Sequence, residues 1–348
     1  MLPALDIHVP CVGTGEFRES HLESQCCRVT GVSRCAQRLS QVERVATSTP
    51  SEVNRSSSSC PATASFPSRE RRRHEETAMT MITAANGRDV KHYIIPLNTN
   101  MSVPPDPVLV TAFDHTHFWE GVALWTMYGR RLQHQYQLII YDLGLHAWQR
   151  HLVRHFFKFP FRIFNFNKYP AHVRNLKNYA FKAAVIQETL QEFGHVFWVD
   201  TSFRLQGNGS LDAYVQANKA HAGLTVWHID GLRQACFIHQ GMLDFFDERA
   251  KDFVESPANE GGAILVYNYP ATYRAIMLPW LVCSLVEKCI SPKGAILTPC
   301  DFSNKFTSKH CCHRYDQSAM GLILERVFHF DTSLYNSSTT RIHTFDRV

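Results

Sequence analysis

Long apolar runs are missing from this sequence of 348 residues. No stretch reaches the roughly 18 to 20 apolar residues that a membrane-spanning helix needs. The longest candidate, residues 275–286, is interrupted by Pro279 and Ser284, so we predict a buried helix there and no transmembrane segment. The first residues also lack a basic segment followed by an apolar one. We see no secretory signal, and expect either a cytoplasmic chain or a missing targeting segment.

A strong charge of one sign is also missing, because the net charge of +5 is thinly spread. Nucleic-acid backbones demand a dense basic stripe, so we expect no nucleic-acid partner. No GxGxxG motif follows the first expected strand, where residues 112–116 read Ala-Phe-Asp-His-Thr. This disfavours a dehydrogenase or a methyltransferase. The histidines, His115 and His117 among them, show neither an HExxH motif nor paired spacing, and we expect most of them to be structural.

Cysteine, in contrast, is abundant: eleven residues, five before residue 61 and six after residue 235. The second group could form three disulfides. Cys283 and Cys289 lack the CxxC spacing of a zinc site, and we interpret them as a structural pair. Four Asn-x-Ser/Thr sequons, which would be glycosylation acceptors in a secretory lumen, favour that compartment slightly. They begin at Asn54, Asn100, Asn208 and Asn336.

Composition and hydrophobic periodicity divide the chain into four parts. Residues 1–90 show no sustained period and are rich in serine and arginine, so we predict a disordered arm. Its arginine run at residues 69–73 could be a targeting or phosphate-binding patch, but a solvated arm explains it better. Residues 91–106 form a linker, 107–335 the folded domain and 336–348 a C-terminal tail.

Within the domain, short apolar runs alternate with amphipathic stretches, which is typical of an α/β fold with a mainly parallel sheet. We predict strands at residues 108–113, 138–141, 162–166, 196–199, 223–227 and 263–267. The best helix carries apolar residues at steps of three and four from Leu176 to Phe193, with Gly194 as its C-cap. A last helix should begin near Asp316 and end near Phe328.

Carboxylates follow three of the expected strands, at Asp114, Asp142 and Asp200. In open α/β sheets ligands collect beyond the carboxyl ends of the strands, because loops and helix N-termini converge there. Aspartate is also a common turn residue and helix cap, and this explanation stays open for each of the three.

The strand ending at Val199 delivers Asp200 and, two residues later, Ser202 to the same edge. This stretch resembles the metal-binding Asp-x-Asp motif of GT-A glycosyltransferases. The resemblance implies carboxylates that hold Mn²⁺ or Mg²⁺ against the diphosphate of a nucleotide-sugar. Because Ser202 replaces the second carboxylate, we expect at most a loosely held ion.

Four strings, in this order, extend the resemblance to a poorly characterised GT-A-like glycosyltransferase family over residues 107–330. They are Tyr141–Leu145, Trp198–Ser202, Pro279–Cys283 and His313–Ser318. The resemblance implies a single GT-A-like domain, a mainly parallel sheet flanked by helices, and a nucleotide-sugar donor. Members look like type II membrane proteins of the secretory pathway, which implies a Golgi location.

The run from His313 to Ser318 directly precedes the last expected helix. We assign His313, with Asp200, to the metal or diphosphate and Arg314 to phosphate charge. Asp316 and Gln317 would contact sugar hydroxyls or the incoming acceptor, with Asp316 catalytic. The alternative is that Asp316 or Ser318 merely caps the helix.

Three further residues are candidates by position. Asn178 and Lys182 lie on the helix before the fourth strand, where related folds contact donor phosphate or ribose, although lysines also serve solubility. Glu260 precedes a strand and could act as a base or acceptor contact, or be an ordinary loop residue.

We therefore expect a glycosyltransferase-like protein with a UDP- or GDP-linked donor and an unknown glycan, protein or lipid acceptor. Asp114 would hold ribose or base. The alternative, motivated by Ser202, is a nucleotide-sugar-binding module of the same fold with weakened catalysis. Both hypotheses require Asp200 and the His313 run to meet in one pocket.

Overall fold

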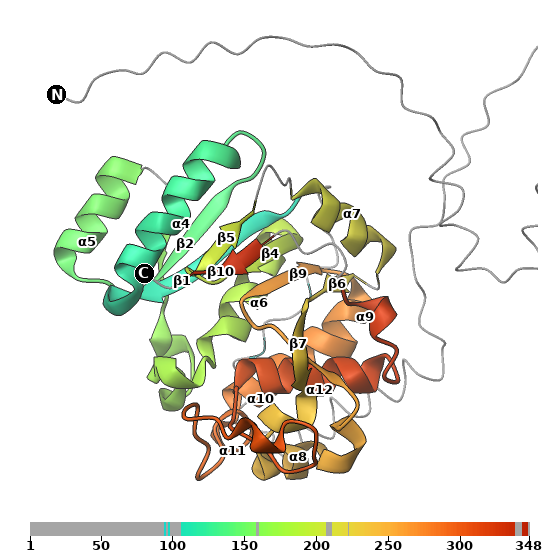
Figure 1. Ribbon diagram of the computed structural model, residues 1–348. Helices are drawn as coiled ribbons and strands as arrows, with labels where there is room; N and C mark the ends of the chain where they lie inside the picture. The colour runs from blue at the N-terminus through green and yellow to red at the C-terminus, as the bar shows by residue number, and fades with distance from the viewer. Residues whose placement is uncertain are drawn as a thin grey trace, which may run out of the picture. The chain divides into compact units, whose positions relative to one another are not determined.

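The structure is a computed structural model of the chain (Figure 1). It describes residues 94, 97, 106–157, 160–206, 211–221, 223–337 and 343–346. The expected disordered arm and most of the linker lie outside the described residues. So do the first five cysteines and the arginine run at 69–73.

A six-stranded sheet in the order β3-β2-β1-β4-β9-β6 forms the centre of the domain. The first four strands are mutually parallel, whereas β9 is antiparallel to both β4 and β6. This confirms the predicted α/β class with a mainly parallel sheet. The strands are β1 Val108–Asp114, β2 Leu138–Gly144, β3 Phe161–Ile163, β4 His195–Val199, β6 Leu224–Thr225 and β9 Ala263–Tyr267.

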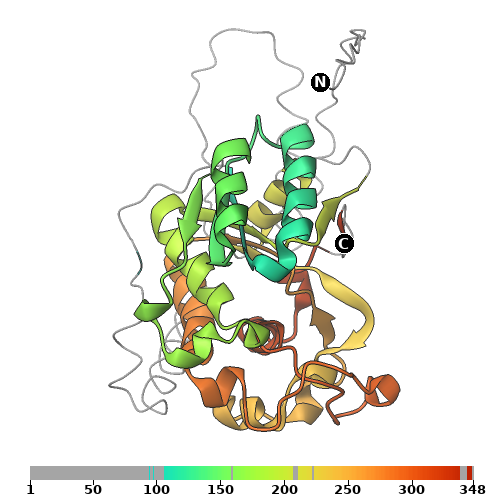
Figure 2. The ribbon, with the colours of Figure 1, turned by 90° about the vertical axis from the view of Figure 1, so that its left-hand side faces the viewer.

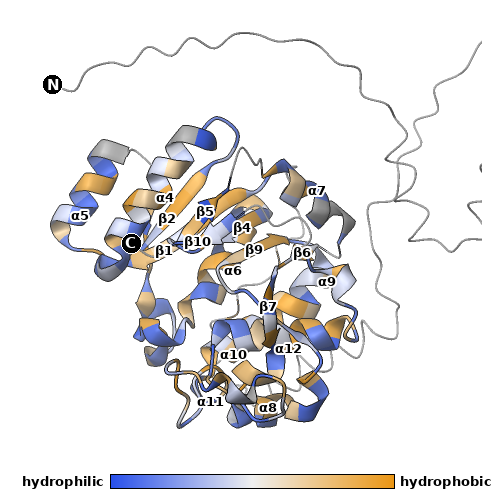
Figure 3. Cartoon of the chain, viewed as in Figure 1, coloured by the Kyte–Doolittle hydropathy of each residue, from blue (hydrophilic) through white to orange (hydrophobic). Residues whose placement is uncertain are grey.

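Both faces of this sheet are covered by helices (Figures 1 and 2). Alternate residues of each strand point to opposite faces, so Val196 and Trp198 of β4 join one apolar cluster, and Phe197 and Val199 the other. Burial on both sides explains why the central strands β4 and β9 are largely apolar, as Figure 3 shows by colour. The first cluster includes α6 Phe181–Phe193, α10 Leu278–Leu285 and α12 Asp316–Val327; the second includes α4 Phe118–Arg131 and α7 Asp212–Ala220.

Helix α6 ends as predicted but begins later than its apolar pattern suggested. Gly194 adopts a left-handed conformation (φ 73°), and its N–H donates to the Leu190 carbonyl at 2.9 Å. At the other end, Leu176–Asn178 form a 3-10 turn closed by Tyr179 at φ 53°. This turn interrupts the helical path and sets the direction from which α6 approaches the edge of the sheet.

The apolar stretch at residues 275–286 is a buried helix, as predicted. A turn of π-helix, Tyr273–Met277, leads into α10, in which every residue from Pro279 to Leu285 is buried. Among the described residues no helix has the length and apolar character needed to cross a bilayer.

Residues expected in a C-terminal tail instead add a strand to the domain. β10, His343–Phe345, pairs antiparallel with β5, Phe203–Leu205, directly after the Asp200 motif. A further ladder joins β7, His228–Arg233, to β8, Pro257–Asn259. The pairing of β10 with β5 brings a distant part of the chain to the edge where Asp200 lies.

All six cysteines after residue 235 are in disulfides, as the sequence suggested. The pairs are Cys236–Cys311, Cys283–Cys289 and Cys300–Cys312. Cys283–Cys289 ties α10 to α11, Glu287–Ile290, and the other two hold the segment before α12. These thiols are therefore structural.

Candidate functional site

The strand order creates a switch point between β1 and β4, because the chain leaves β1 toward β2 on one side and returns to β4 on the other. Loops diverge at such a point and leave room for a ligand beyond the carboxyl ends. Asp114 is the last residue of β1, and Asp200 immediately follows β4. The Asp200 N–H donates to the Gly262 carbonyl at 2.9 Å, which holds Asp200 beside the start of β9.

At this edge Asp200 forms a charged group with Lys182 and Asp316, and it is the most accessible of the three. Its side chain is 35% exposed. Oδ1 accepts a hydrogen bond from Trp198 Nε1 at 2.8 Å and lies 3.3 Å from Lys182 Nζ. A side chain at position 262 would meet Asp200 Oδ2 at 3.1 Å and the Phe345 ring at 2.5 Å. Glycine at 262 thus permits this close packing.

Lys182 forms the centre of the group. Its side chain, only 3% exposed, places Nζ 2.8 Å from Asp316 Oδ2 and 2.9 Å from the Gly261 carbonyl. With Asp200 these acceptors match the three protons of the ammonium group. Burial works to lower the pKa of Lys182, but the two carboxylates outweigh it and raise the pKa above its usual value. Lys182 is therefore a fixed buried cation.

Asp316 begins α12 and is nearly inaccessible, at 4% exposed. Burial raises the pKa of this carboxyl, and Lys182 opposes the rise. The N-cap position of α12 is Tyr315, which makes no side-chain capping bond. The Ser318 hydroxyl accepts from the Arg314 N–H at 2.9 Å and donates to the Phe237 carbonyl, and the Asp316 side chain faces Lys182.

Gln317 presents an unsatisfied amide beside this pair. Its Nε2 is buried and has no hydrogen-bond partner among the described residues. Its Cβ lies 3.3 Å from where a Cβ at Gly261 would be. A buried donor without an acceptor costs free energy unless something supplies one, so this amide points to a polar ligand.

Asp114 is held in a turn at the end of β1. Its Oδ1 accepts from the Thr116 N–H at 3.1 Å, the Thr116 hydroxyl at 2.6 Å and His117 Nδ1 at 3.1 Å. Burial works to raise the pKa of Asp114, but these hydrogen bonds outweigh it and lower the pKa well below its usual value. Asp114 is a turn residue, as its alternative explanation held, and also a permanent negative charge.

His117, which sequence reasoning left among the structural histidines, completes this end of the edge. Its hydrogen bond to Asp114 raises its pKa; burial works against the rise, and the charges of Glu120, Asp114 and Asp200 add to it. The side chain is 57% exposed. His117 is thus a readily protonated group between Asp114 and Asp200.

His313 lies apart from this group. It is fully buried, with Nδ1 accepting from the His239 N–H at 3.2 Å and Nε2 donating to the Ile290 carbonyl at 3.1 Å. Burial lowers its pKa to about 4. Both ring nitrogens serve the backbone, so neither has a lone pair left for a metal, and we remove His313 from the site.

Three other predicted site residues make contacts that serve the fold. Asn178 accepts from the Ala180 N–H at 3.0 Å and donates to the His172 carbonyl at 2.9 Å, which shapes the start of α6. The Arg314 guanidinium lies over the Phe237 ring, 5.5 Å from its centroid. Glu260 Oε2 lies 3.0 Å from His343 Nε2 and so anchors β10. Asp142 behaves likewise: it is buried and accepts two backbone N–H groups and Arg150.

The groups at this edge do not form a ready-made site for a divalent ion. Asp200 Oδ1 and Asp316 Oδ2 already face Lys182, and Ser202 supplies a hydroxyl where a second carboxylate was expected. No group of three or more histidine, cysteine or acidic residues suited to a metal occurs among the described residues. A metal would meet two acids that already share the Lys182 ammonium, and a serine hydroxyl, which is a weaker ligand than a carboxylate.

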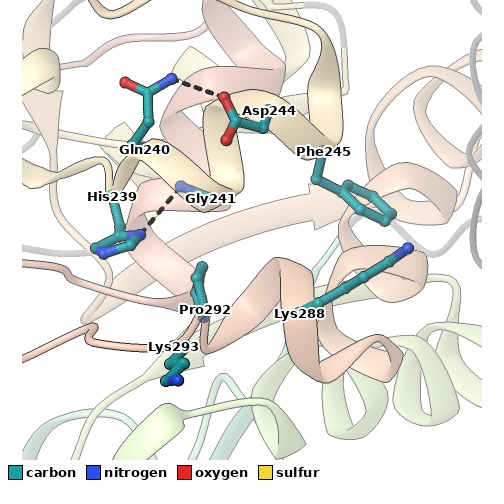
Figure 4. A pocket seen from close by; sticks show the side chains of 8 residues that line it. All are labelled: His239, Gln240, Gly241, Asp244, Phe245, Lys288, Pro292 and Lys293. Atoms are coloured by element: carbon teal, nitrogen blue, oxygen red, sulfur yellow. Dashed lines mark hydrogen bonds between the residues drawn. The ribbon is translucent and has the colours of Figure 1, made fainter.

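An open pocket elsewhere in the domain is separate from this edge. It lies between α8, Gln240–Phe246, and α11 (Figure 4). Its lining residues are His239, Gln240, Gly241, Asp244, Phe245, Lys288, Pro292 and Lys293. None of them belongs to the charged group, and Lys288 lies over the Phe245 ring. We therefore keep this pocket apart from the candidate site.

Comparisons with known proteins give a family match over part of the chain and several distant structural likenesses. A family described as "Protein of unknown function (DUF1647)" matches residues 77–187, about a third of the chain. This segment includes Asp114 and Lys182 but neither Asp200 nor Asp316. No curated protein matches.

Several solved structures resemble this chain. The galactosyltransferase LgtC, in complex with donor and acceptor sugar analogs, aligns at 12% identity over 62% of this chain and 70% of its own, with a TM-score of 0.36. Mouse xyloside xylosyltransferase 1 aligns at 11% identity over 67% of this chain and 84% of its own, with a TM-score of 0.37. The S. cerevisiae mannosyltransferase Ktr4p aligns at 8% identity over 72% of this chain and 81% of its own, with a TM-score of 0.41. Likenesses this distant fix neither a reaction nor a substrate for this chain.

Proposed function

We propose that this protein binds a nucleotide-sugar at the edge formed by Lys182, Asp200, Asp316 and Gln317, and transfers the sugar to an acceptor. The observation that carries the proposal is the buried Lys182, shared by two carboxylates at the switch point of the sheet. A buried, charge-paired group with a shifted pKa in a ligand-binding position is typical of a functional site.

The sugar half of the donor suits the Asp316 side of the edge. Sugar hydroxyls both donate and accept hydrogen bonds, and here a carboxylate accepts while the Gln317 amide donates. Lys182 keeps Asp316 oriented. Because the Lys182 ammonium already faces two acidic side chains, it has little positive charge to offer a phosphate, and the group favours hydroxyls.

The nucleotide half suits the β1 side. Asp114 carries a permanent negative charge suited to ribose hydroxyls, and the protonated form of His117 offers a positive charge to phosphate. Both are held by the turn after β1, so they need little ordering when a ligand arrives. Asp200 lies between the two halves, near the bond that would break.

In the transfer, the acceptor hydroxyl oxygen bonds to the anomeric carbon as the bond from that carbon to the diphosphate breaks. The hydroxyl proton passes to a carboxylate, and the nucleoside diphosphate leaves with the bonding electrons. Asp316 and Asp200 are the candidate acceptors of the proton, and burial raises the pKa of Asp316, which favours proton binding there. No step through a metal is proposed.

A secretory location is part of the proposal. Three disulfides staple the domain, and such bonds persist in oxidising compartments. Detection of oxidised Cys236–Cys311 in the protein isolated from cells under thiol-blocking conditions would support it; free thiols at these positions would contradict it.

The test is a thermal-shift panel of UDP- and GDP-linked sugars, each compared with its free nucleotide. In the wild type we expect the matching nucleotide-sugar to raise Tm more than the nucleotide alone. Asp316→Asn should lose this extra rise and keep the nucleotide effect, whereas the control Asp244→Asn on α8 should keep both. A wild type that responds to no member of the panel would contradict donor binding.

The second candidate, a binding module without turnover, is favoured by Ser202 in place of the second carboxylate. Donor hydrolysis, measured with and without Mn²⁺ at the concentration that saturates the thermal shift, separates the two. Released sugar supports the enzyme. A saturated thermal shift without released or transferred sugar supports the module.

A further inference from the structure

Two tryptophans stand out on the surface beside the candidate site. Trp119 is 63% exposed and Trp148 52%, although indoles are among the side chains that gain most from burial. Each is the second residue of a helix that follows a strand: Trp119 in α4 and Trp148 in α5, Ala147–Leu152. Both therefore lie near the carboxyl edge of the sheet, where ligands bind.

The two indoles are built on a common base. Each packs edge-on against the buried Phe118 ring, with centroids 5.3 Å apart and an interplanar angle of 70° in both cases. Phe118 in turn packs on the buried Trp125 at 6.0 Å. The core thus supports both exposed rings from below and leaves their outer surface open.

The loops that carry these tryptophans are tied together. The His115 and His146 rings are in contact, with centroids 4.5 Å apart. The Gln149 amide donates to the His115 carbonyl at 3.3 Å and accepts from the His146 N–H at 2.8 Å. The two indoles are therefore held in place before any ligand arrives, which lowers the ordering cost of binding.

Trp119 is also connected directly to the proposed donor site. His117, two residues before it, bonds to Asp114, and Glu120, the residue after it, accepts from the Thr201 hydroxyl at 2.8 Å. Thr201 follows Asp200 in the chain. A ligand resting on Trp119 would therefore have one end next to the donor.

We propose that Trp119 and Trp148 form a platform that binds a neutral carbohydrate acceptor; this rests on the proposed function, which puts the donor beside it. The C–H face of a sugar ring packs against a flat indole, while its hydroxyls need donors and acceptors at the rim. His115, His117, His146 and Glu120 provide such a rim. Imidazoles and a carboxylate, without a basic cluster among these rim residues, suit a neutral glycan better than an anionic lipid surface.

The experiment uses the full chain and a printed array of neutral oligosaccharides of glucose, galactose, mannose, xylose and N-acetylglucosamine. We expect the wild type to bind at least one class. The Trp119→Ala and Trp148→Ala variants should each lose about tenfold in affinity, and the double variant should lose binding. Trp119→Phe should retain part of it. Phe306→Ala, which removes a 55% exposed aromatic elsewhere, is the matched control and should bind as the wild type does.

Thermal shifts with nucleotide-sugars separate this proposal from the donor site. The double variant should keep the wild-type donor response, and loss of that response would mean that the indoles belong to the donor site, which overturns the platform. Wild-type glycan affinity in the double variant, or no array member bound by the wild type, would also overturn it. If the double variant loses self-association or vesicle binding while its glycan binding is unchanged, that result would overturn the platform as well. Glycan binding by a wild type that ignores every donor would support the platform while the proposed function fails.

Discussion

Helix α12 carries two buried carboxylates in different surroundings. Asp316, in its first turn, faces Lys182 and the accessible Asp200. Glu325, near its other end, is fully buried and accepts the Tyr335 hydroxyl at 2.9 Å. Burial raises the pKa of both acids. For Asp316 a cation opposes the rise, whereas for Glu325 only hydrogen bonds from Tyr335 and Ser256 do, and its pKa is raised to about 7.

The comparison separates an acid held for a ligand from an acid held by the fold. Asp316 is buried, but its partner Asp200 reaches solvent and the adjacent Gln317 amide lacks a partner among the described residues. Glu325 is covered by Tyr335, itself fully buried. An acid whose charged partner reaches solvent can meet a substrate, whereas a sealed one mainly makes stability depend on pH.

The largest expected effect on the free energy of unfolding comes from removing the positive charge of Lys182 beside Asp316. Lys182→Met leaves two carboxylates close together without compensation and should lower the free energy of unfolding by about 3 to 5 kcal/mol. Chemical denaturation measures it. Lys177→Met, an exposed lysine just before α6, is the control and should change stability little. Equal effects of the two substitutions would contradict a buried charge cluster.

The pH dependence of the free energy of unfolding tests whether Glu325 is an acid sealed in the fold. Its folded pKa of about 7 lies above its ordinary value of 4.5, so Glu325 contributes stability that is fully present below about 4.5 and lost as pH rises through about 7. Glu325→Gln does not ionise. The variant should match the wild type near pH 4.5 and exceed it by about 3 kcal/mol at pH 8. A difference that is the same at both pH values would show that Glu325 does not titrate in this range.

A smaller effect on stability is expected from Mn²⁺, for which the Asp200–Lys182–Asp316 group is not a ready-made site. Mn²⁺ alone should leave the Tm of the wild type unchanged, because Lys182 already lies against Asp200 and Asp316 and Ser202 offers only a hydroxyl. Ser202→Asp restores the second carboxylate and should allow Mn²⁺ to stabilise the protein by about 1 kcal/mol. Ser308→Asp, in an exposed loop, is the control. A Mn²⁺ response in the wild type as large as in Ser202→Asp would contradict this description of the edge.

Local patterns predicted the framework of this site well, because strand periodicity and the Gly194 cap act over short distances. They put Asp114 and Asp200 at the ends of their strands. The meeting of Lys182 and Asp316 depends on how α6 and α12 pack, and only the family resemblance suggested both segments. The Gly261–Gly262 pair was a missed signal, since adjacent glycines beside a strand often mark close backbone approach.

Other assignments failed to anticipate tertiary contacts. His313 was grouped with Asp316 because the two are near in sequence, but the left-handed Tyr315 (φ 44°) between them separates their directions. Glu260 pairs with His343, far along the chain, and no local pattern indicates that strand β10 exists. The edge strand β3 ends at Ile163 instead of 166, and β6 shrinks because Val226 bridges to Asn336.

Calorimetric titration of the best nucleotide-sugar into the wild type and Asp200→Asn tests the central claim most directly. The substitution keeps the shape of the side chain and changes a partly exposed group, so the fold should survive. If the edge binds the donor, affinity should fall by about tenfold or more, since a charged hydrogen-bonding partner is worth about 1.5 to 3 kcal/mol. Equal affinities for the two proteins would contradict a donor site at Asp200.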